Sequence, residues 1–293
     1  MHIFIPRQFS AQDLFQKTGV CFVQPSDLPS EITFDFSKLG FARPTGVVFL
    51  NNLTRYLLSQ DVVVKYAGMN VESPAIRYLD DSLFFEPLLG QKLNPQSQPR
   101  GTTIPLTEVT TLQYTGWLSF TLVPWLVECT GYPEEVFAEL RTCLAEVFNN
   151  IKDHTTNGVA SVFCQWFPKE KSLRIALADF GVGVPATVSR VAAGLSDNDA
   201  ILKAFEEGFS SQSIPTNRGI GLHFLKQNVV ENLHGRLTLR SQSGAICFDP
   251  NGNETVFVPN YVQGYCPGTM IELEIPTEKF DLEPQEAVNL SWI

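Results

Sequence analysis

Residues 173–185, LRIALADFGVGVP, combine a predicted strand with a polar turn that contains two glycines. The first six residues are mainly apolar and are typical of a buried strand. Asp179 follows directly, and a carboxylate at the end of a buried strand is unfavourable unless a partner compensates for its desolvation. Gly181 and Gly183 come next, and glycine lets the backbone approach a ligand closely or adopt positive φ. The stretch therefore predicts a ligand site at the strand end, with a simple tight turn as the alternative.

A long helix is predicted upstream of this strand, over residues 134–153, because Pro133 stands where a helix commonly begins. Glu146, Asn150 and His154 recur at intervals of four and therefore share one face of this helix. Apolar residues form the neighbouring stripe. A polar row beside an apolar stripe indicates a helix that lines a pocket, and a solvent-exposed helix edge is the alternative.

Downstream, RGIGL at residues 218–222 opens another predicted helix after the polar loop GFSSQSIPTN at residues 208–217. Glycine-rich backbone at a helix N-terminus offers unpaired N–H groups to an anion. The hydroxyl of Ser211 and the charge of Arg218 suit a phosphate group. The segment lacks the P-loop pattern GxxxxGKS or GxxxxGKT. It also follows too many elements to be the opening turn of a Rossmann fold.

The order and spacing of these pieces resemble the GHKL ATPase family, which includes ATP-binding domains of gyrase, heat-shock chaperones, histidine kinases and mismatch-repair proteins. Five segments carry the resemblance, namely an N box, two glycine boxes and two closing strands: AEVFNNIKDH (145–154), DFGVGVP (179–185), NRGIGLHFLKQNV (217–229), HGRLTLRSQSG (234–244) and GTMIELEIP (268–276). The resemblance spans residues 133–276. It implies a Bergerat-type α/β sandwich, in which helices cover a mixed sheet, and it implies ATP and Mg²⁺ as cofactors.

The resemblance also implies roles for individual residues. Asn150 is similar to the Mg²⁺ ligand, Glu146 to the carboxylate that polarises the attacking water, and Asp179 to the acceptor for the exocyclic amine of adenine. The other ATP contacts implied are Gly181, Gly183, Ser211, Arg218, Gly219, Gly221, Leu222 and Thr269. Residues 186–217 would form the ATP lid. A single amide ligand is enough for Mg²⁺, which keeps water and phosphate ligands.

Residues 90–103, GQKLNPQSQPRGTT, have the composition of a linker and divide a front part from a longer rear part. In the front part, strands predicted at 31–36 and 61–66 alternate with helices at 45–58 and 74–89, which favours a small α/β sandwich. The rear part is predicted to contain helices at 117–128, 134–153, 197–207 and 221–233 and strands at 103–110, 160–167, 173–178, 236–241, 245–248, 255–259 and 269–275.

The front segment ITFDFSKLGFARPTGVVFLNNLTRYLLSQDVVVKYAG, residues 32–68, resembles STAS domains. Many STAS domains carry Asp-Ser before the glycine of this loop. Pro44 stands at the position of that acceptor serine, which disfavours regulated phosphorylation there. Thr45 is an alternative acceptor, or an N-cap of the following helix. We expect a STAS-like domain, a linker with a connecting strand and helix, an ATP-binding domain and a tail, at residues 1–92, 93–132, 133–280 and 281–293.

Composition limits the possible classes of partner and location. The chain has 293 residues and a formal charge of −10, which disfavours binding to a nucleic-acid backbone. Six scattered cysteines without a CxxC pair disfavour a zinc site and indicate free thiols in a reducing compartment. The N-terminus lacks the pattern of a signal peptide. The most apolar segment, residues 116–132, is too short to span a bilayer. We therefore expect a cytoplasmic protein that does not enter a membrane.

Three functions fit these observations. The first is a slow ATPase that acts as a nucleotide-dependent switch in signalling, as the pair Glu146 and Asn150 indicates. The second is an anti-sigma-type serine/threonine kinase that acts on a STAS partner. The third is a scaffold in which the nucleotide is structural. A sensor histidine kinase is disfavoured because His2 is the only histidine before residue 154. Each function implies a protein partner or self-association.

Overall fold

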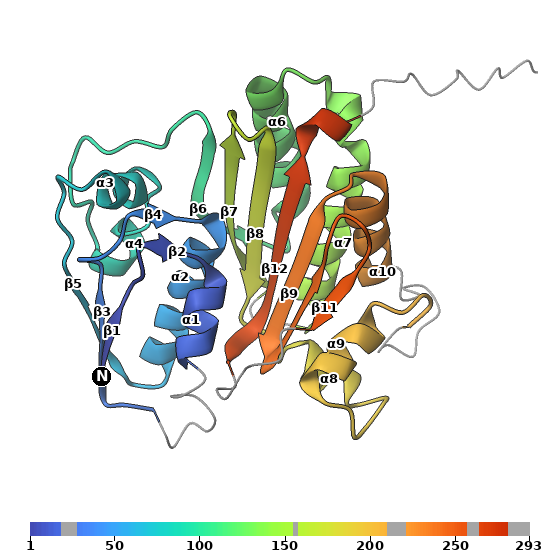
Figure 1. Cartoon of the computed structure of the whole chain (residues 1–293), viewed down its shortest axis with the longest axis horizontal. Coiled ribbons are helices and arrows are strands. Elements are labelled where there is room, and N and C mark those ends of the chain that lie inside the picture. Colours follow the sequence, from blue (N-terminus) through green and yellow to red (C-terminus); the bar gives the residue numbers. More distant parts are fainter. Residues whose placement is uncertain (19–27, 155–157, 210–220, 257–263, 281–293) are drawn as a thin grey trace, which may run out of the picture.

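Seven strands form one sheet in the middle of the molecule (Figure 1). The computed structural model describes residues 1–18, 28–154, 158–209, 221–256 and 264–280. In chain order the strands are β6 (Thr103–Thr110), β7 (Val159–Phe167), β8 (Ser172–Asp179), β9 (Arg236–Gln242), β10 (Gly244–Phe248), β11 (Glu254–Val256) and β12 (Cys266–Pro276). Their order across the sheet is β11-β10-β9-β12-β8-β7-β6. The last of the described strands, β12, therefore lies beside β8 in the interior of the sheet.

The directions of these strands correct one expected detail. We expected a mixed sheet in the rear part, but the six neighbouring pairs that the described residues form in the seven-stranded sheet are all antiparallel. β8 and β9 run in the same direction, as strands joined by a helical crossover can, but β12 lies antiparallel between them. Asp179 at the end of β8 pairs with Ala160 of β7, and Ala178 pairs with Met270 of β12. The end of β8 and the starts of β7 and β12 therefore meet at one end of the sheet.

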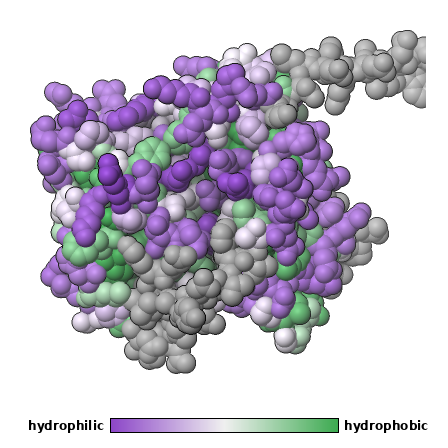
Figure 2. All heavy atoms as spheres, in the orientation of Figure 1, coloured by the Kyte–Doolittle hydropathy of each residue, from purple (hydrophilic) through white to green (hydrophobic). Residues whose placement is uncertain are grey.

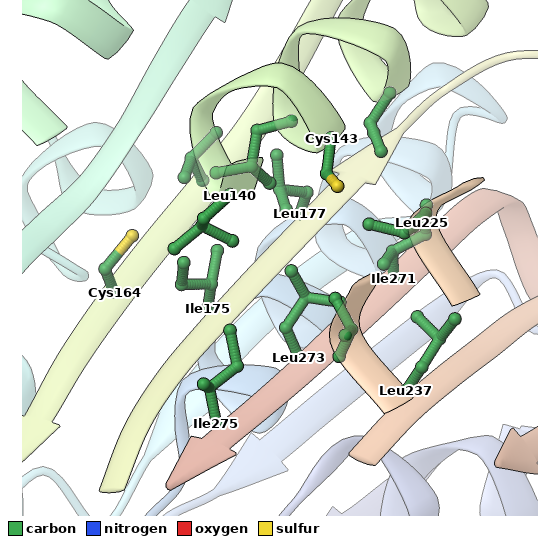
Figure 3. Close-up of a cluster of buried hydrophobic side chains, with 14 of the residues drawn as sticks. Leu140, Cys143, Cys164, Ile175, Leu177, Leu225, Leu237, Ile271, Leu273 and Ile275 are labelled. Carbon is green, nitrogen blue, oxygen red and sulfur yellow. The ribbon is translucent and has the colours of Figure 1, made fainter. Parts of the chain in front are cut away.

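Helices cover one face of this sheet (Figure 1). They include α5 (Tyr114–Trp117), α6 (Val123–Thr130), α7 (Ala138–His154) and α10 (Gly221–Lys226), with π-helical turns at Leu118–Leu122 and Gln227–Asn232 and a 3-10 turn at Glu134–Phe137. Alternate residues of β8, namely Leu173, Ile175 and Leu177, point to these helices at the two-residue period of a strand. Figure 3 shows the resulting core, in which Leu140 and Cys143 of α7 lie over side chains of the sheet.

The front part of the chain covers the opposite face of the sheet (Figure 1). It consists of β1 (His2–Phe4), β2 (Gln8–Phe9), α1 (Ala11–Thr18), β3 (Glu31–Asp35), β4 (Phe41–Ala42), α2 (Pro44–Ser59), β5 (Val63–Ala67), α3 (Pro74–Asp81) and α4 (Glu86–Leu89). β1, β3 and β5 form a parallel sheet. α2 contacts β7, β8 and β12. The small side chains of Ala176, Ala178 and Ala245 allow this close approach, and they share one core with the front part.

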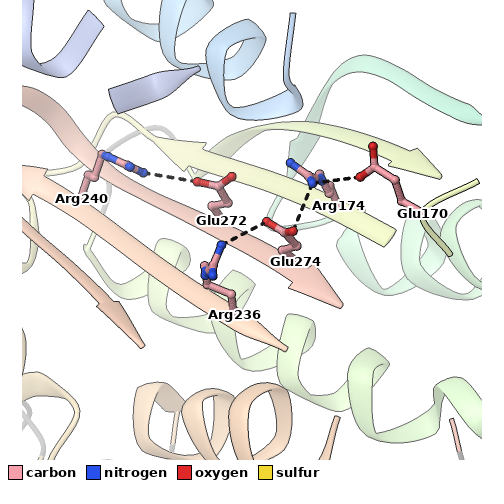
Figure 4. A network of polar contacts seen from close by, with 6 residues as sticks. All are labelled: Glu170, Arg174, Arg236, Arg240, Glu272 and Glu274. Atoms are coloured by element: carbon pink, nitrogen blue, oxygen red, sulfur yellow. Dashed lines mark hydrogen bonds and ion pairs between the residues drawn. The ribbon is translucent and has the colours of Figure 1, made fainter. Parts of the chain in front are cut away.

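A network of charged residues lies on the same face of the sheet and is drawn in Figure 4. Its members are Glu170, Arg174, Arg236, Arg240, Glu272 and Glu274. The side chains of Arg174 and Arg240 are only 8% and 5% exposed. The front part contributes Gln12 of α1, whose Oε1 accepts a hydrogen bond of 3.2 Å from Arg240. Each ion pair joins residues of the rear part, and the hydrogen bond to Gln12 connects this network to the front part.

The expected α/β fold with two parts is confirmed, with local differences. The helix expected at residues 74–89 is divided into α3 and α4, because Leu83 adopts φ 59°. The helix expected at 117–128 runs from Tyr114 to Thr130 and contains a π-helical turn just before Pro124, which cannot donate a main-chain hydrogen bond. The expected domain limits and the STAS resemblance stay predictions, and the expected tail at 281–293 lies outside the described residues.

The surface is mainly hydrophilic, and the described cysteines are free thiols. On the face shown in Figure 2, hydrophilic residues predominate and hydrophobic residues form small separate patches. No helix in the described ranges has the length and apolarity needed to cross a membrane. Five of the six cysteines are described, and all five are free thiols, four of them buried. Cys21 lies outside the described residues.

Candidate functional site

Asp179 stands at the end of β8 with its carboxylate held by two main-chain amides. Its Oδ1 accepts hydrogen bonds from the N–H of Gly181 at 2.6 Å and from the N–H of Thr269 at 3.3 Å. Within the described part of the chain, no group donates a hydrogen bond to Oδ2. Burial raises the pKa of Asp179 to about 6, and the two main-chain hydrogen bonds act in the opposite direction. The backbone therefore orients the carboxylate through Oδ1.

Two glycines allow the chain to approach Asp179 from β12 and from the turn after β8. Gly268 has φ 74°, and a Cβ there would lie 2.2 Å from the main-chain oxygen of Asp179. Gly183 has φ 87°, and a Cβ there would lie 2.7 Å from Ser241 Oγ. Only glycine adopts this conformation at both places without strain. The glycine-box residue Gly183 is thus required by packing as well as by backbone conformation.

Ser241 of β9 links the two segments that surround Asp179, and the sequence did not identify it. Its hydroxyl donates to the main-chain oxygen of Gly268 at 2.7 Å and accepts from the N–H of Val184 at 2.9 Å. It also lies 3.4 Å from Thr269 Oγ1. The serine lies within the segment HGRLTLRSQSG, but a single serine in a strand is no signal by itself. Its role depends on β12 lying between β8 and β9.

Asn150 of α7 lies directly against the start of α10. A Cβ on Gly221 would lie 2.7 Å from Asn150 Nδ2, so the glycine leaves room for this amide. Glu146 lies one helical turn earlier and is half-buried. Asn149 Nδ2 lies 3.5 Å from Glu146 Oε1, and Asn149 Oδ1 accepts a hydrogen bond of 3.0 Å from the Tyr114 hydroxyl. Tyr114 is a second residue that the sequence did not identify, because a distant helix supplies it.

The structure thus assembles most of the predicted site residues into two groups. Asp179, Gly181, Gly183 and Thr269 meet at the end of β8, and Asn150 and Gly221 meet between α7 and α10, with Glu146 one helical turn from Asn150. Leu222 differs, since its side chain packs against the hydrophobic core. The remaining predicted contacts, Ser211, Arg218 and Gly219, lie outside the described residues, as do residues 210–217 of the expected lid and the side chain of His154. Residues 186–209 of the expected lid are described and contain helix α9 (Asp197–Ala204).

The two groups lie at the same end of the helix-covered face. Asn150 is close to the C-terminus of α7, which is followed by β7, and the start of β7 pairs with Asp179 at the end of β8. Asp179 has the same parity along β8 as Leu173, Ile175 and Leu177, which face the helices. A ligand bound over this end of the sheet could therefore contact the Asp179 carboxylate on one side and the Asn150 amide on the other.

The donor set is compatible with Mg²⁺. The Asn150 amide oxygen and the Glu146 carboxylate are hard oxygen ligands of the kind that Mg²⁺ prefers. No group of three or more His, Cys, Asp or Glu side chains in the described ranges could hold a metal ion by itself. A cation beside Asn150 would thus need further ligands, and the phosphate oxygens of a nucleotide can supply them.

Comparison with known proteins supports this interpretation of the site. Residues 136–278 match the family described as histidine kinase-, DNA gyrase B-, and HSP90-like ATPase. The match covers α7, both described groups of site residues and β12. No curated protein matches the chain. Residues 136–278 therefore form an ATP-binding domain of the histidine kinase-, DNA gyrase B- and HSP90-like ATPase family.

Proposed function

We propose that this chain binds Mg-ATP, hydrolyses it slowly and uses its nucleotide state as a conformational switch. The observation that carries the proposal is the Asp179 carboxylate, which two main-chain amides orient through Oδ1 while Oδ2 has no donor among the described residues. The exocyclic amine of adenine is a hydrogen-bond donor that suits this oxygen. The adjoining backbone at Gly181 and Gly183 has no side chain that would obstruct a flat base.

The residues of α7 would act on the phosphates. Asn150 would hold Mg²⁺ through its amide oxygen, and bound Mg²⁺ would supply neutralisation of phosphate charge. Glu146 lies one turn away on the same face and would orient and polarise a water molecule for attack on the terminal phosphorus. The contact of Asn149 with Glu146, and that of Tyr114 with Asn149, would limit the orientations of this carboxylate. A loop that the terminal phosphate orders is an established type of switch.

The role of Glu146 is tested by the Glu146→Ala variant. Steady-state phosphate release should fall at least about a hundredfold, because a positioned acid or base contributes that much, while ATP binding should persist. Glu139→Ala is a matched control, since Glu139 lies on the same helix and is exposed. Equal phosphate release by wild type and Glu146→Ala would exclude Glu146 as the base.

The fate of the phosphate distinguishes the alternatives. The chain is incubated with γ-labelled ATP in the presence and absence of a STAS-domain protein. Label released to water supports the ATPase, whereas label on a serine or threonine of the protein supports the anti-sigma-type kinase. Equal affinities for ATP and ADP without turnover would support a scaffold, because a ligand with no preference between two states cannot drive a switch.

We further propose that the switch acts through a protein partner or through self-association. Two large hydrophobic side chains outside the nucleotide site support this proposal: Leu112 is 94% exposed and Phe120 is 84% exposed. Both belong to the segment around α5 that precedes α7. Since Tyr114 of α5 contacts Asn149, a partner on this segment would lie close to the catalytic helix.

A further inference from the structure

Two asparagines of α2 are buried between the front part and the sheet. Asn51 and Asn52 are only 2% and 3% exposed. Asn51 Nδ2 lies 3.1 Å from Ser161 Oγ of β7 and 3.2 Å from Asn52 Oδ1. Asn52 Nδ2 donates to the main-chain oxygen of Asp179 at 3.4 Å. Because buried amides need hydrogen bonds, these contacts fix the position of α2 relative to the ends of β7 and β8.

The front part also contacts the segment that leads into β12. A Cβ on Gly264 would lie 2.3 Å from the Phe15 ring of α1, so the chain passes directly against this ring. The rings of Tyr265 and Tyr56, which belongs to α2, have centroids 6.0 Å apart. The front part therefore supports both backbone segments that meet at the Asp179 carboxylate.

We propose that Asn52 is a positioning residue for the nucleotide site. Its side-chain amide holds the main-chain carbonyl of Asp179, and the position of that carbonyl determines where the carboxylate meets adenine. Gly268 limits movement of the same carbonyl, since it approaches so closely that a Cβ would lie 2.2 Å from the oxygen. Asn52 comes from the domain on the opposite face of the sheet, so it acts through Asp179. The inference rests on the function proposed above.

This role makes the front part a component of the nucleotide site. A change in the packing of α2 would alter the Asn52 contact, and through it the affinity for adenine nucleotides. The terminal phosphate would be unaffected, because Glu146 and Asn150 lie on α7, on the helix-covered face. Asn52 should therefore influence the binding of ATP and ADP more than the hydrolysis of bound ATP.

The Asn52→Leu variant of the full chain tests this role, because leucine is similar in size and lacks the donor. We expect KM for ATP and Kd for ADP to rise about threefold to tenfold, as for the loss of one intramolecular hydrogen bond, while kcat is unchanged. Thr54→Val is the matched control. Thr54 is equally buried on α2, but its hydroxyl accepts from Tyr66 of the front part at 3.1 Å. Its nucleotide constants should equal those of wild type, and Tm of both variants reports any general loss of stability.

The outcomes separate this inference from the proposed function. An unchanged Kd for ADP in Asn52→Leu, or an equal rise in Thr54→Val, would overturn the inference alone. If Asn52→Leu does not fold, Asn52→Ser is measured in the same way, since serine is too short to reach the Asp179 carbonyl. A wild-type chain that binds no ADP would overturn the proposed function itself.

Discussion

The buried carboxylate of Asp179 is expected to lower the stability of its domain at neutral pH. Burial raises its pKa from 3.8 to about 6, so the folded state holds the proton more tightly than the unfolded chain does. Above about pH 6 the carboxylate is ionised in both states, and the folded state bears the full desolvation penalty. As the pH falls from about 6 towards 4, the folded state becomes protonated and this penalty disappears. Such a penalty is expected where a carboxylate is kept for a ligand.

The Asp179→Asn variant should be more stable than wild type at neutral pH. Asparagine can still accept from the amides of Gly181 and Thr269, but it carries no charge to bury. The shift from 3.8 to about 6 corresponds to a gain of up to about 3 kcal/mol in the free energy of unfolding. The gain should shrink as the pH falls through about 6 and vanish near pH 4. Urea unfolding across this range measures it, and a less stable Asp179→Asn variant at neutral pH would contradict this account.

Among the elements, β12 reaches Asp179 only because Gly268 carries no side chain. In Gly268→Ala the new methyl group would meet the Asp179 carbonyl oxygen, in addition to the strain of φ 74°. Gly131→Ala is the control, since Gly131 ends α6 with φ 77° and has nothing within 4 Å of its Cβ position.

We expect Gly131→Ala to lower stability by about 1 kcal/mol through conformation alone, and Gly268→Ala to lower it by at least about 1 kcal/mol more. Gly268→Ala should also weaken ADP binding, whereas Gly131→Ala should not. Chemical unfolding and calorimetric titration of both variants measure these effects. Equal losses of stability in the two variants would mean that the close contact between β12 and the Asp179 carbonyl does not contribute to the effect.

At the start of α10, a mutation should leave the stability of the fold intact but weaken the effect of Mg²⁺ on nucleotide binding. In Gly221→Ala the methyl group would lie 2.7 Å from Asn150 Nδ2, the end of a side chain that can rotate away. We expect Tm to be unchanged or higher, because alanine favours a helix. The Mg²⁺ dependence of ADP affinity should fall, since Asn150 is displaced. Gly116→Ala in α5, whose Cβ would be 3.9 Å from the nearest atom, should likewise leave Tm unchanged or raise it, but should not change the Mg²⁺ dependence.

The sequence predicted most helices and strands of the ATP-binding domain, and three candidate site residues lie in local patterns that the sequence shows. Asp179 ends an apolar run, and Asn150 repeats at helical spacing with Glu146. Ser241 and Tyr114 could not be predicted, since they reach the site only through β12 inserting between β8 and β9 and through α5 packing on α7. The expectation of a mixed sheet was wrong because strand direction also depends on contacts between distant parts of the sequence. The direction of β12 follows from its partners, which lie far away in sequence.

At the scale of the whole molecule, the seven-stranded sheet has a core on each face. Phe163, Ala176 and Met270 point to the front part, while Leu177 and Ile271 point to the helices. The linker composition of residues 90–103 predicted a division between a front part and a longer rear part. The structure shows that the front part also shares a core with the sheet and contacts it through Gln12, Asn51 and Asn52. A linker pattern describes the connection and carries no information about the interface.

We therefore expect the two parts to unfold together. Differential scanning calorimetry should give one transition, with calorimetric and van't Hoff enthalpies in a ratio of about 1. ADP with Mg²⁺ should move the whole transition to higher temperature, because ligand binding to the folded state stabilises every part coupled to it. Two separate transitions, with only one responding to ADP, would show that the front part is an independent unit.

The central claim is that the ends of β8, β12 and α7 form a site for an adenine nucleotide with Mg²⁺. Calorimetric titration of the full chain with Mg-ADP tests it most directly, with Asp179→Asn as the comparison. The account predicts that wild type binds a single nucleotide per chain, and that Asp179→Asn, although no less stable, loses most of this affinity. Equal binding by the two proteins, or no binding by wild type, would contradict it.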